Sequence, residues 1–141
     1  MNMNIKRLAI GSIAGTIVLY ALGILIWVYL FADFFNANGG GAVGVTRPEM
    51  ITWALIVGTL LYGVLVTLAL EWRGSKSVVD ALITGAVVGA LLWGASDFTH
   101  YALNTMNNLQ ATIADTVLEG VRAGVAGAAI ALVLGKVGDQ Q

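Results

Sequence analysis

Four long apolar stretches limit what this chain can fold into. Residues 8–32, 50–70 and 81–96 contain no charged side chain. A fourth stretch, residues 109–134, contains three. A helix that crosses a bilayer needs about 20 predominantly apolar residues, so four such helices fill the chain except for short connections. We therefore predict a single all-α domain, residues 1–141, in which four transmembrane helices form an antiparallel bundle. The predicted helices are residues 5–32, 47–72, 77–104 and 108–136.

The composition agrees with a membrane location. The chain is 58% hydrophobic and 11% charged, whereas soluble domains carry about 25% charged residues. It contains no cysteine, which excludes disulfides and thiolate metal sites. The net charge of −1 gives no indication of nucleic-acid binding. The partner that we expect from the hydrophobic composition is the lipid bilayer. The first apolar run is longer than the core of about 7–15 residues in a signal peptide, so we expect a retained helix.

The basic residues outside the predicted helices indicate the orientation. On one side of the membrane fall Lys6, Arg7, Arg73, Lys76 and Lys136. The opposite side has Arg47 in its loops. Cytoplasmic loops of membrane proteins carry the excess of lysine and arginine. We therefore predict that both termini are cytoplasmic.

Capping motifs mark three of the predicted helix starts. Residues 46–49, Thr-Arg-Pro-Glu, form a capping box with proline in the first turn and predict the start of the second helix. Residues 77–80, Ser-Val-Val-Asp, do the same for the third helix with a shorter acid. Asn107 or Asn108 is suited to cap the fourth.

The fourth predicted helix carries three charged residues inside the membrane. They are Asp115, Glu119 and Arg122, and at about 100° per residue they fall on one helix face. Each ionised group near a bilayer centre costs roughly 2.5–3.5 kcal/mol on translocon scales. Three together must be paired with one another or used for a function.

A second polar stripe lies on the third predicted helix. Its members are spaced by three and four residues, which places them on one helix face: Trp93, Asp97, His100, Tyr101 and Asn104. The connection to the fourth helix is short, so the two helices are antiparallel neighbours. We expect the two stripes to face each other in the outer half of the bilayer, with Asp97 and Asp115 at similar depth.

Such a cluster has the composition of a proton or ion site. Asp115 and Glu119 are one helical turn apart, where burial and mutual repulsion oppose the stabilising charges of Arg122 and a protonated His100. A carboxyl group in that balance can exchange a proton near neutral pH. We predict that Asp97 joins these four residues in a site that is open to the outer side and binds a proton, an ion or a small polar ligand, as in a transporter.

Secondary positions around this predicted site are Asp33 and Glu49, at the outer ends of the first two helices, and Trp93, Tyr101 and Asn104. The alternative is a network of interhelical salt bridges that only sets the helix register.

Metal binding and enzymatic activity find little support. Asp97 and His100 with Asp115 and Glu119 offer oxygen and imidazole ligands, but four-helix carboxylate sites use acids from all four helices, and the middles of the first two are uncharged here. Arg122 would also repel a cation. Ser96, although close to Asp97 and His100, matches no catalytic triad. We expect no metal, no cofactor and no enzymatic activity.

Small residues form a separate stripe on the fourth predicted helix: Gly120, Gly124 and Gly127. Such faces allow close contact between helices. The stripe lies about 100–180° from the charged residues, so it faces away from the bundle if the charges face inward. It either packs closely within one bundle or contacts a second copy or a partner membrane subunit. The alternative function is therefore a structural or accessory subunit of a homo-oligomer or a larger complex.

Four short strings carry a resemblance to a known group. They are Phe31-Ala-Asp33-Phe34-Phe35-Asn36, Arg47-Pro-Glu49-Met50, Ala95-Ser-Asp97-Phe98 and Ile113-Ala-Asp115. The chain resembles small bacterial four-helix integral membrane proteins described as a domain of unknown function. This resemblance implies the bacterial inner membrane and no established activity, so no catalytic residue is carried over. Small multidrug exporters have a similar helix count, but they typically place a glutamate in the first helix, where residues 8–32 have none.

Overall fold

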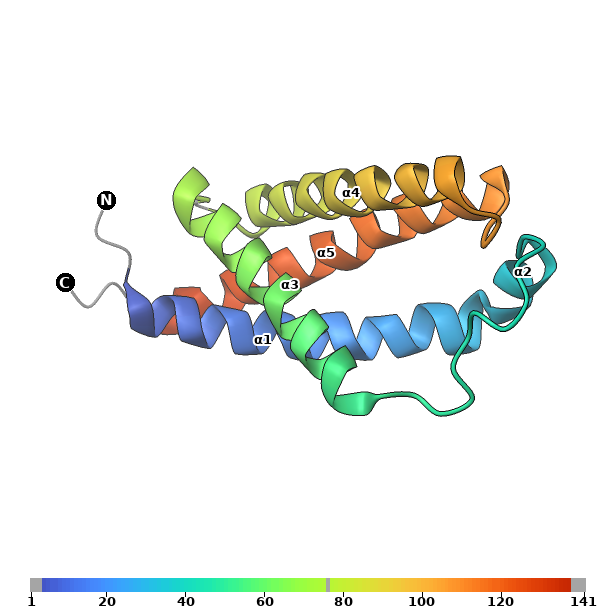
Figure 1. The fold of residues 1–141 in the computed structure, drawn as a ribbon. Helices are drawn as coiled ribbons and strands as arrows, with labels where there is room; N and C mark the ends of the chain where they lie inside the picture. The colour runs from blue at the N-terminus through green and yellow to red at the C-terminus, as the bar shows by residue number, and fades with distance from the viewer. Residues whose placement is uncertain (1–3, 76, 138–141) are drawn as a thin grey trace.

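The computed structural model describes residues 4–75 and 77–137, and these ranges are helical without a β-strand (Figure 1). The elements are α1 (Ile5–Gly23), the π-helical segment η1 (Ile24–Leu30), α2 (Ala32–Ala37), α3 (Thr52–Arg73), α4 (Val78–Leu103) and α5 (Leu109–Val137). Four helices are long and apolar enough to cross a membrane, namely α1 continued by η1, α3, α4 and α5. The prediction of an all-α protein with four such helices is confirmed.

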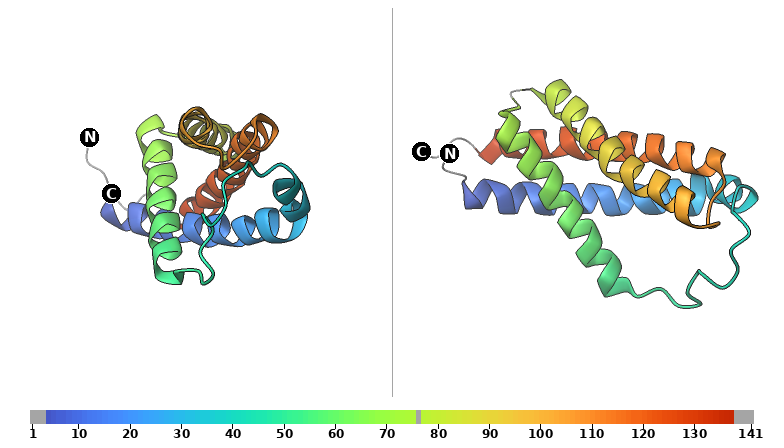
Figure 2. Two further views of the ribbon diagram at one scale, coloured as in Figure 1. Left: turned by 45° about the vertical axis from the view of Figure 1, so that its right-hand side comes forward. Right: turned by 45° about the horizontal axis from the view of Figure 1, so that its top comes forward.

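The helices pack on two sides of α5, with α4 on one side and α1 with α3 on the other. α4 lies against α5 along most of its length, and α1 runs along another side of α5, as the views in Figures 1 and 2 agree. α3 crosses α1 obliquely. It packs mainly through its second half, whereas residues 52–58 are all exposed. The core consists of apolar side chains from α1, α3, α4 and α5: Leu19, Tyr62, Val66, Leu70, Ala81, Ala123, Ala126, Ile130 and Leu134.

Glycines bring α4 and α5 into close contact. A Cβ atom on Gly127 would collide with the carbonyl oxygen of Ala81, and one on Gly124 would lie 3.1 Å from the carbonyl oxygen of Leu82. Gly120 is packed against α4 in the same way. The glycine stripe therefore packs within the chain, which is the first of its two predicted alternatives, and the inward-facing charges do not turn it away from the bundle. α5 lies between α4 on its glycine side and α1 with α3 on its charged side, so both faces are internal.

The first predicted helix, residues 5–32, is interrupted. α1 ends at Gly23, and the seven residues of η1 follow with π-helical geometry. The amide of Phe31 donates to the carbonyl of Ile26 at 2.8 Å, five residues earlier, before the chain turns into α2. Nothing in the hydropathy of this stretch distinguishes a π-helix from an α-helix. Such segments within helices are frequent at functional sites.

The second helix begins later than its capping motif predicts. α3 starts at Thr52 rather than near residue 47, and its N-cap, Ile51, makes no side-chain capping bond. Residues 47–51 are exposed and not helical, so the local capping signal alone does not start a helix there.

The other two capping predictions are confirmed. The Ser77 hydroxyl accepts from the amide of Asp80 at 3.0 Å, and the Asn108 side chain accepts from the amide of Ala111 at 2.9 Å. Lys76, which was counted for the orientation, lies outside the described residues.

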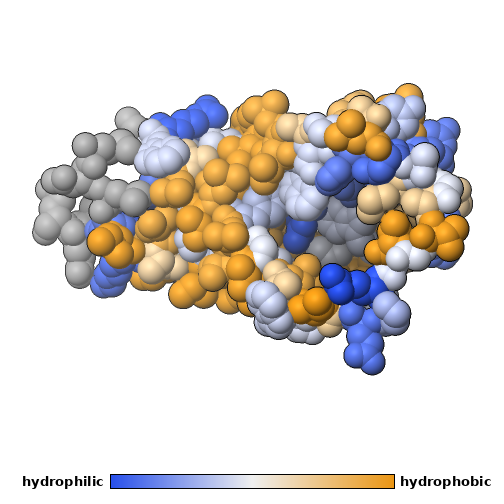
Figure 3. All heavy atoms as spheres, viewed as in Figure 1, coloured by the Kyte–Doolittle hydropathy of each residue, from blue (hydrophilic) through white to orange (hydrophobic). Residues whose placement is uncertain are grey.

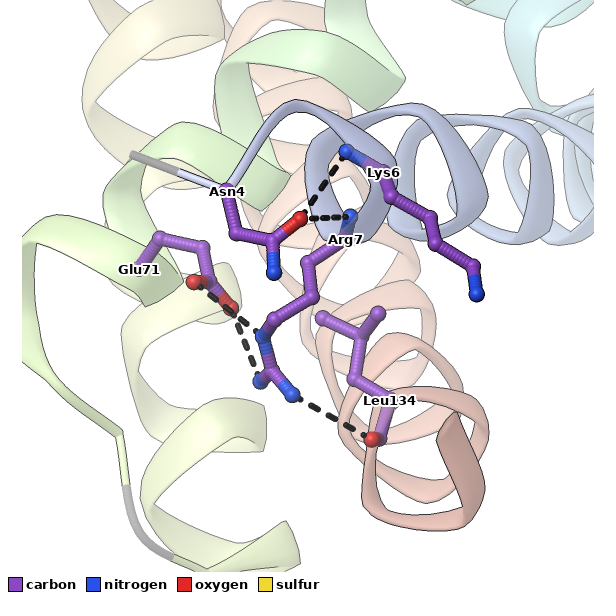
Figure 4. Close-up of polar contacts among 5 residues, drawn as sticks. All are labelled: Asn4, Lys6, Arg7, Glu71 and Leu134. Carbon is purple, nitrogen blue, oxygen red and sulfur yellow. Dashed lines mark hydrogen bonds and ion pairs between the residues drawn. The ribbon is translucent and has the colours of Figure 1, made fainter. Parts of the chain in front are cut away.

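Arg7 joins three helices at the end of the molecule where α1 begins (Figure 4). Its guanidinium forms an ion pair with Glu71 of α3 at 3.1 Å and donates to the carbonyl oxygen of Leu134 in α5 at 3.4 Å. The start of α1 and the ends of α3 and α5 therefore lie together at one end of the molecule.

Candidate functional site

Arg122 is the centre of a buried cluster. Its Nη1 lies 2.6 Å from Glu119 Oε1 on the same helix, and its Nε donates to the carbonyl oxygen of Leu19 in α1 at 2.8 Å. The guanidinium carbon is 5.2 Å from the ring centroid of Trp27 in η1 and 5.8 Å from that of Tyr62 in α3. One cation thus connects α5 with α1, η1 and α3.

Gly23 leaves the space that the guanidinium occupies. A Cβ atom at this position would lie 2.9 Å from Arg122 Nη2. The glycine stands at the junction of α1 and η1, where the helical geometry changes. A larger residue at this junction would displace Arg122 from its contacts with α1.

The two aspartates lie beside this cluster. Asp115 accepts a hydrogen bond from Trp27 Nε1 at 2.7 Å, so η1 contributes a direct contact to the acid. Asp97 of α4 accepts from the Thr116 hydroxyl at 3.3 Å, and it is close enough to Asp115 for the two carboxyl groups to interact. The structure therefore brings Asp97 and Asp115 together at the contact between α4 and α5.

The two polar stripes face each other at Asp97 and Asp115, but the expectation that they also do so at Glu119 and Arg122 is wrong. Glu119 and Arg122 point toward α1 and α3, because the glycines of α5 occupy the side that faces α4. Their exposed fractions are 3% and 9%. The charged pair is therefore enclosed on the side of the molecule opposite the one that sequence reasoning assigned to it.

The remaining predicted residues are outside the cluster, with one exception. The side chains of His100, Tyr101, Asp33 and Glu49 are exposed and make no hydrogen bond or ion pair within residues 4–75 and 77–137. His100 lies at the edge of the cluster, near enough to Asp97 for their charges to interact. Asn104 caps the turn after α4 by accepting from the amide of Met106 at 3.1 Å. The exception is Trp93, whose ring packs edge-on against that of Tyr62 with 6.3 Å between the centroids.

A cavity of about 910 Å³ adjoins the cluster. Asp115, Glu119 and Arg122 form part of its wall, and most of the rest is apolar or aromatic side chains of α1, η1, α3 and α4. The space-filling view shows a hollow beside α3 in which hydrophilic surface lies between hydrophobic surfaces (Figure 3). The volume falls within the range of about 300–1,000 Å³ that small-molecule sites occupy.

Three buried polar atoms at this cavity form no hydrogen bond of regular geometry in the described part of the chain, although the Tyr62 hydroxyl lies next to both Glu119 and Trp93. They are the Tyr62 hydroxyl, Trp93 Nε1 and Glu119 Oε2, and all three residues line the cavity. Buried polar atoms in folded proteins nearly always have a partner, which is often an ordered water or a ligand. These atoms therefore indicate a ligand or water position next to Glu119.

Sequence reasoning missed Trp27, Tyr62 and Gly23. A hydroxyl in the middle of an uncharged span is a weak signal that points to Tyr62. Trp27 and Gly23 have no such signal, because an indole and a glycine are ordinary residues in a membrane helix.

Within residues 4–75 and 77–137, no three histidine or acidic side chains are grouped so as to hold a metal ion. No protein-family model, curated protein or solved structure matches the chain.

Proposed function

We propose that this chain is a four-span protein of the bacterial inner membrane with antiparallel helices and both termini in the cytoplasm. Its buried cluster binds a proton, an ion or a small polar ligand. The end of the molecule that holds the start of α1 and the ends of α3 and α5 carries Lys6, Arg7, Arg73 and Lys136. That distribution supports a cytoplasmic position for this end. The bacterial location follows from the resemblance of the four short strings.

The observation that carries the proposal is the unpartnered Glu119 Oε2 at the cavity. Arg122 holds the other oxygen of this carboxyl group, whereas Oε2 has the neighbouring Tyr62 hydroxyl beside it and no hydrogen bond of regular geometry among the described residues. A buried acceptor without a partner is costly, and a proton or a ligand with a donor group removes that cost.

The charge balance supports the same conclusion. Asp97, Asp115 and Glu119 are three carboxyl groups beside a single guanidinium, that of Arg122. Unbalanced charge inside a membrane is expensive and is generally paired or functional. Bound protons or a bound cation would restore the balance.

Access to the cluster is blocked on the side of the Arg7 end. Val66, Ile130 and Leu134 are buried there in the core. Ile130 and Leu134 are about 12 and 18 Å beyond Arg122 along α5, at 1.5 Å per residue. Packed side chains therefore close the cluster toward this end.

The test is a comparison of acid variants in proteoliposomes. Glu119→Gln and Asp115→Asn should keep the helical circular dichroism spectrum but lose pH-dependent binding or flux. Trp27 provides a binding readout, because its indole donates directly to Asp115 and its fluorescence responds to the charge there. The matched control is Glu49→Gln, which removes an exposed acid before α3. An unchanged pH response in both cluster variants would refute the proposal.

The glycine stripe no longer supports the alternative of an accessory subunit. Gly120, Gly124 and Gly127 are occupied by α4, so they are not available to a second copy or a partner.

A further inference from the structure

We infer that the ligand of this cavity is an amphiphilic amine that enters sideways from the lipid, with an apolar body and a cationic head. This inference rests on the proposed function and specifies the ligand of that site. It follows from the chemistry of two parts of the cavity. The rim consists of exposed apolar side chains, whereas the floor consists of Asp115, Glu119 and Arg122 and includes the acceptor Glu119 Oε2.

The rim of the cavity is apolar. The exposed side chains that border it come from η1, α3 and α4: Ile24, Val28, Leu55, Leu61 and Leu92. In a chain that spans a membrane, such a rim contacts acyl chains. A route for a hydrated ion would instead be lined by polar groups. The ligand therefore reaches the site after partitioning into the bilayer.

The floor of the cavity requires a donor head. Arg122 is already held by Glu119 Oε1 and by the carbonyl oxygen of Leu19, and Asp115 Oδ1 already accepts from Trp27. Glu119 Oε2 makes no hydrogen bond of regular geometry within the described ranges, and beside it lie the Tyr62 hydroxyl and an excess of carboxyl groups. An ammonium group supplies both the donors and the positive charge, and the three carboxyl groups of Asp97, Asp115 and Glu119 outweigh the repulsion from the single guanidinium of Arg122.

Two aromatic residues extend the site toward the apolar rim. The Tyr62 oxygen is a second unpartnered acceptor, and its ring packs against Trp93. The Trp93 indole donor is also unpartnered, and a hydroxyl group or a water beside the amine would accept from it. The aromatic faces provide the apolar contact that the body of an amphiphile needs.

The tryptophans of the chain supply a local reporter. Trp27 and Trp93 line the cavity, whereas Trp53 and Trp72 are exposed. A variant with Trp53→Phe and Trp72→Phe keeps the cavity pair. The complementary variant, with the two cavity tryptophans replaced by phenylalanine, keeps the exposed pair and reports partitioning into the bilayer.

The probes are three bromoalkyl amphiphiles that differ in their heads. 11-Bromoundecylamine, 11-bromoundecanol and 11-bromoundecanoic acid are added to the protein in phosphatidylcholine nanodiscs, because bromine quenches a tryptophan that it contacts. We expect the amine to quench the cavity pair saturably and at about one-tenth of the concentration that the alcohol requires, since hydrogen bonds to charged groups are the stronger ones. The acid should quench least.

Two variants distinguish the effect of the cavity volume on quenching from the effect of the Glu119 charge. Gly58 lines the cavity, and a Cβ atom there would meet no atom within 4 Å, so Gly58→Phe adds a ring to the open space beside it. It should abolish saturable quenching by all three probes. Glu119→Gln should keep the cavity and abolish the preference for the amine.

Equal quenching by the three probes, or quenching that Gly58→Phe leaves unchanged, would overturn the inference. The proposed function is judged separately by the pH response of Trp27 and its loss in Glu119→Gln. If that response is present without an amine preference, only the ligand class is wrong. If both are absent, the proposed function fails as well.

Discussion

Replacing Arg122 by methionine should strongly destabilise the protein. The substitution strands Glu119 as a buried, unpaired acid, and breaking a buried ion pair in this way costs about 3–5 kcal/mol. It also removes the donor to the Leu19 carbonyl, worth about 1 kcal/mol, and the contacts with the rings of Trp27 and Tyr62, worth about 0.5–2 kcal/mol. These contributions overlap because the groups touch, so we expect a total loss of about 4 kcal/mol.

The assay is reversible unfolding by sodium dodecyl sulfate in dodecylmaltoside micelles, followed by circular dichroism. The double variant Arg122→Met with Glu119→Met should recover most of the loss, because replacing both members of a buried pair by apolar residues is often neutral. Arg73→Ala is the control. Its ion pair with Asp80 has an exposed arginine side chain and should contribute at most about 1 kcal/mol.

The reasoning is refuted if Arg122→Met lowers the free energy of unfolding by no more than the Arg73→Ala control. It is also refuted if the double variant is as unstable as the single one, because the cost would then come from packing rather than from the stranded carboxyl group.

Two further predictions concern packing and topology. Gly127→Leu should disrupt the contact between α4 and α5, because its side chain meets the Ala81 carbonyl, whereas Gly58→Ala should be tolerated; equal thermal stability of the two variants would contradict the close-packed interface. Because the chain contains no cysteine, single cysteines can map its orientation. In intact cells, a membrane-impermeant maleimide should label Asn107→Cys but not Ser77→Cys, and the reverse pattern would place the termini outside.

The sequence predicts the spans well because their signal is the total apolar length, which does not depend on tertiary packing. It also predicts the caps of α4 and α5, at Ser77 and Asn108, which are followed directly by apolar helix. The capping box at residues 46–49 misleads because it lies before the apolar span, within which α3 begins at Thr52. Local patterns therefore succeed where packing reinforces them.

The charged residues of α5 were found from the sequence, but their neighbours were not. The helical periodicity of the sequence gives the angular position of Glu119 and Arg122 on α5. It does not give the helix that covers this face, because that depends on where α3 crosses α1. The π-helical segment that directs Trp27 toward Asp115 has no hydropathy signal.

The central claim is that Glu119 Oε2 binds a ligand in the membrane cavity. A high-resolution structure of the protein in lipid nanodiscs tests it most directly. We predict density within hydrogen-bonding distance of Glu119 Oε2 and the Tyr62 hydroxyl, and its loss in Glu119→Gln. A closed and dry site, in which these two groups bond to each other and nothing else occupies the cavity, would contradict the claim.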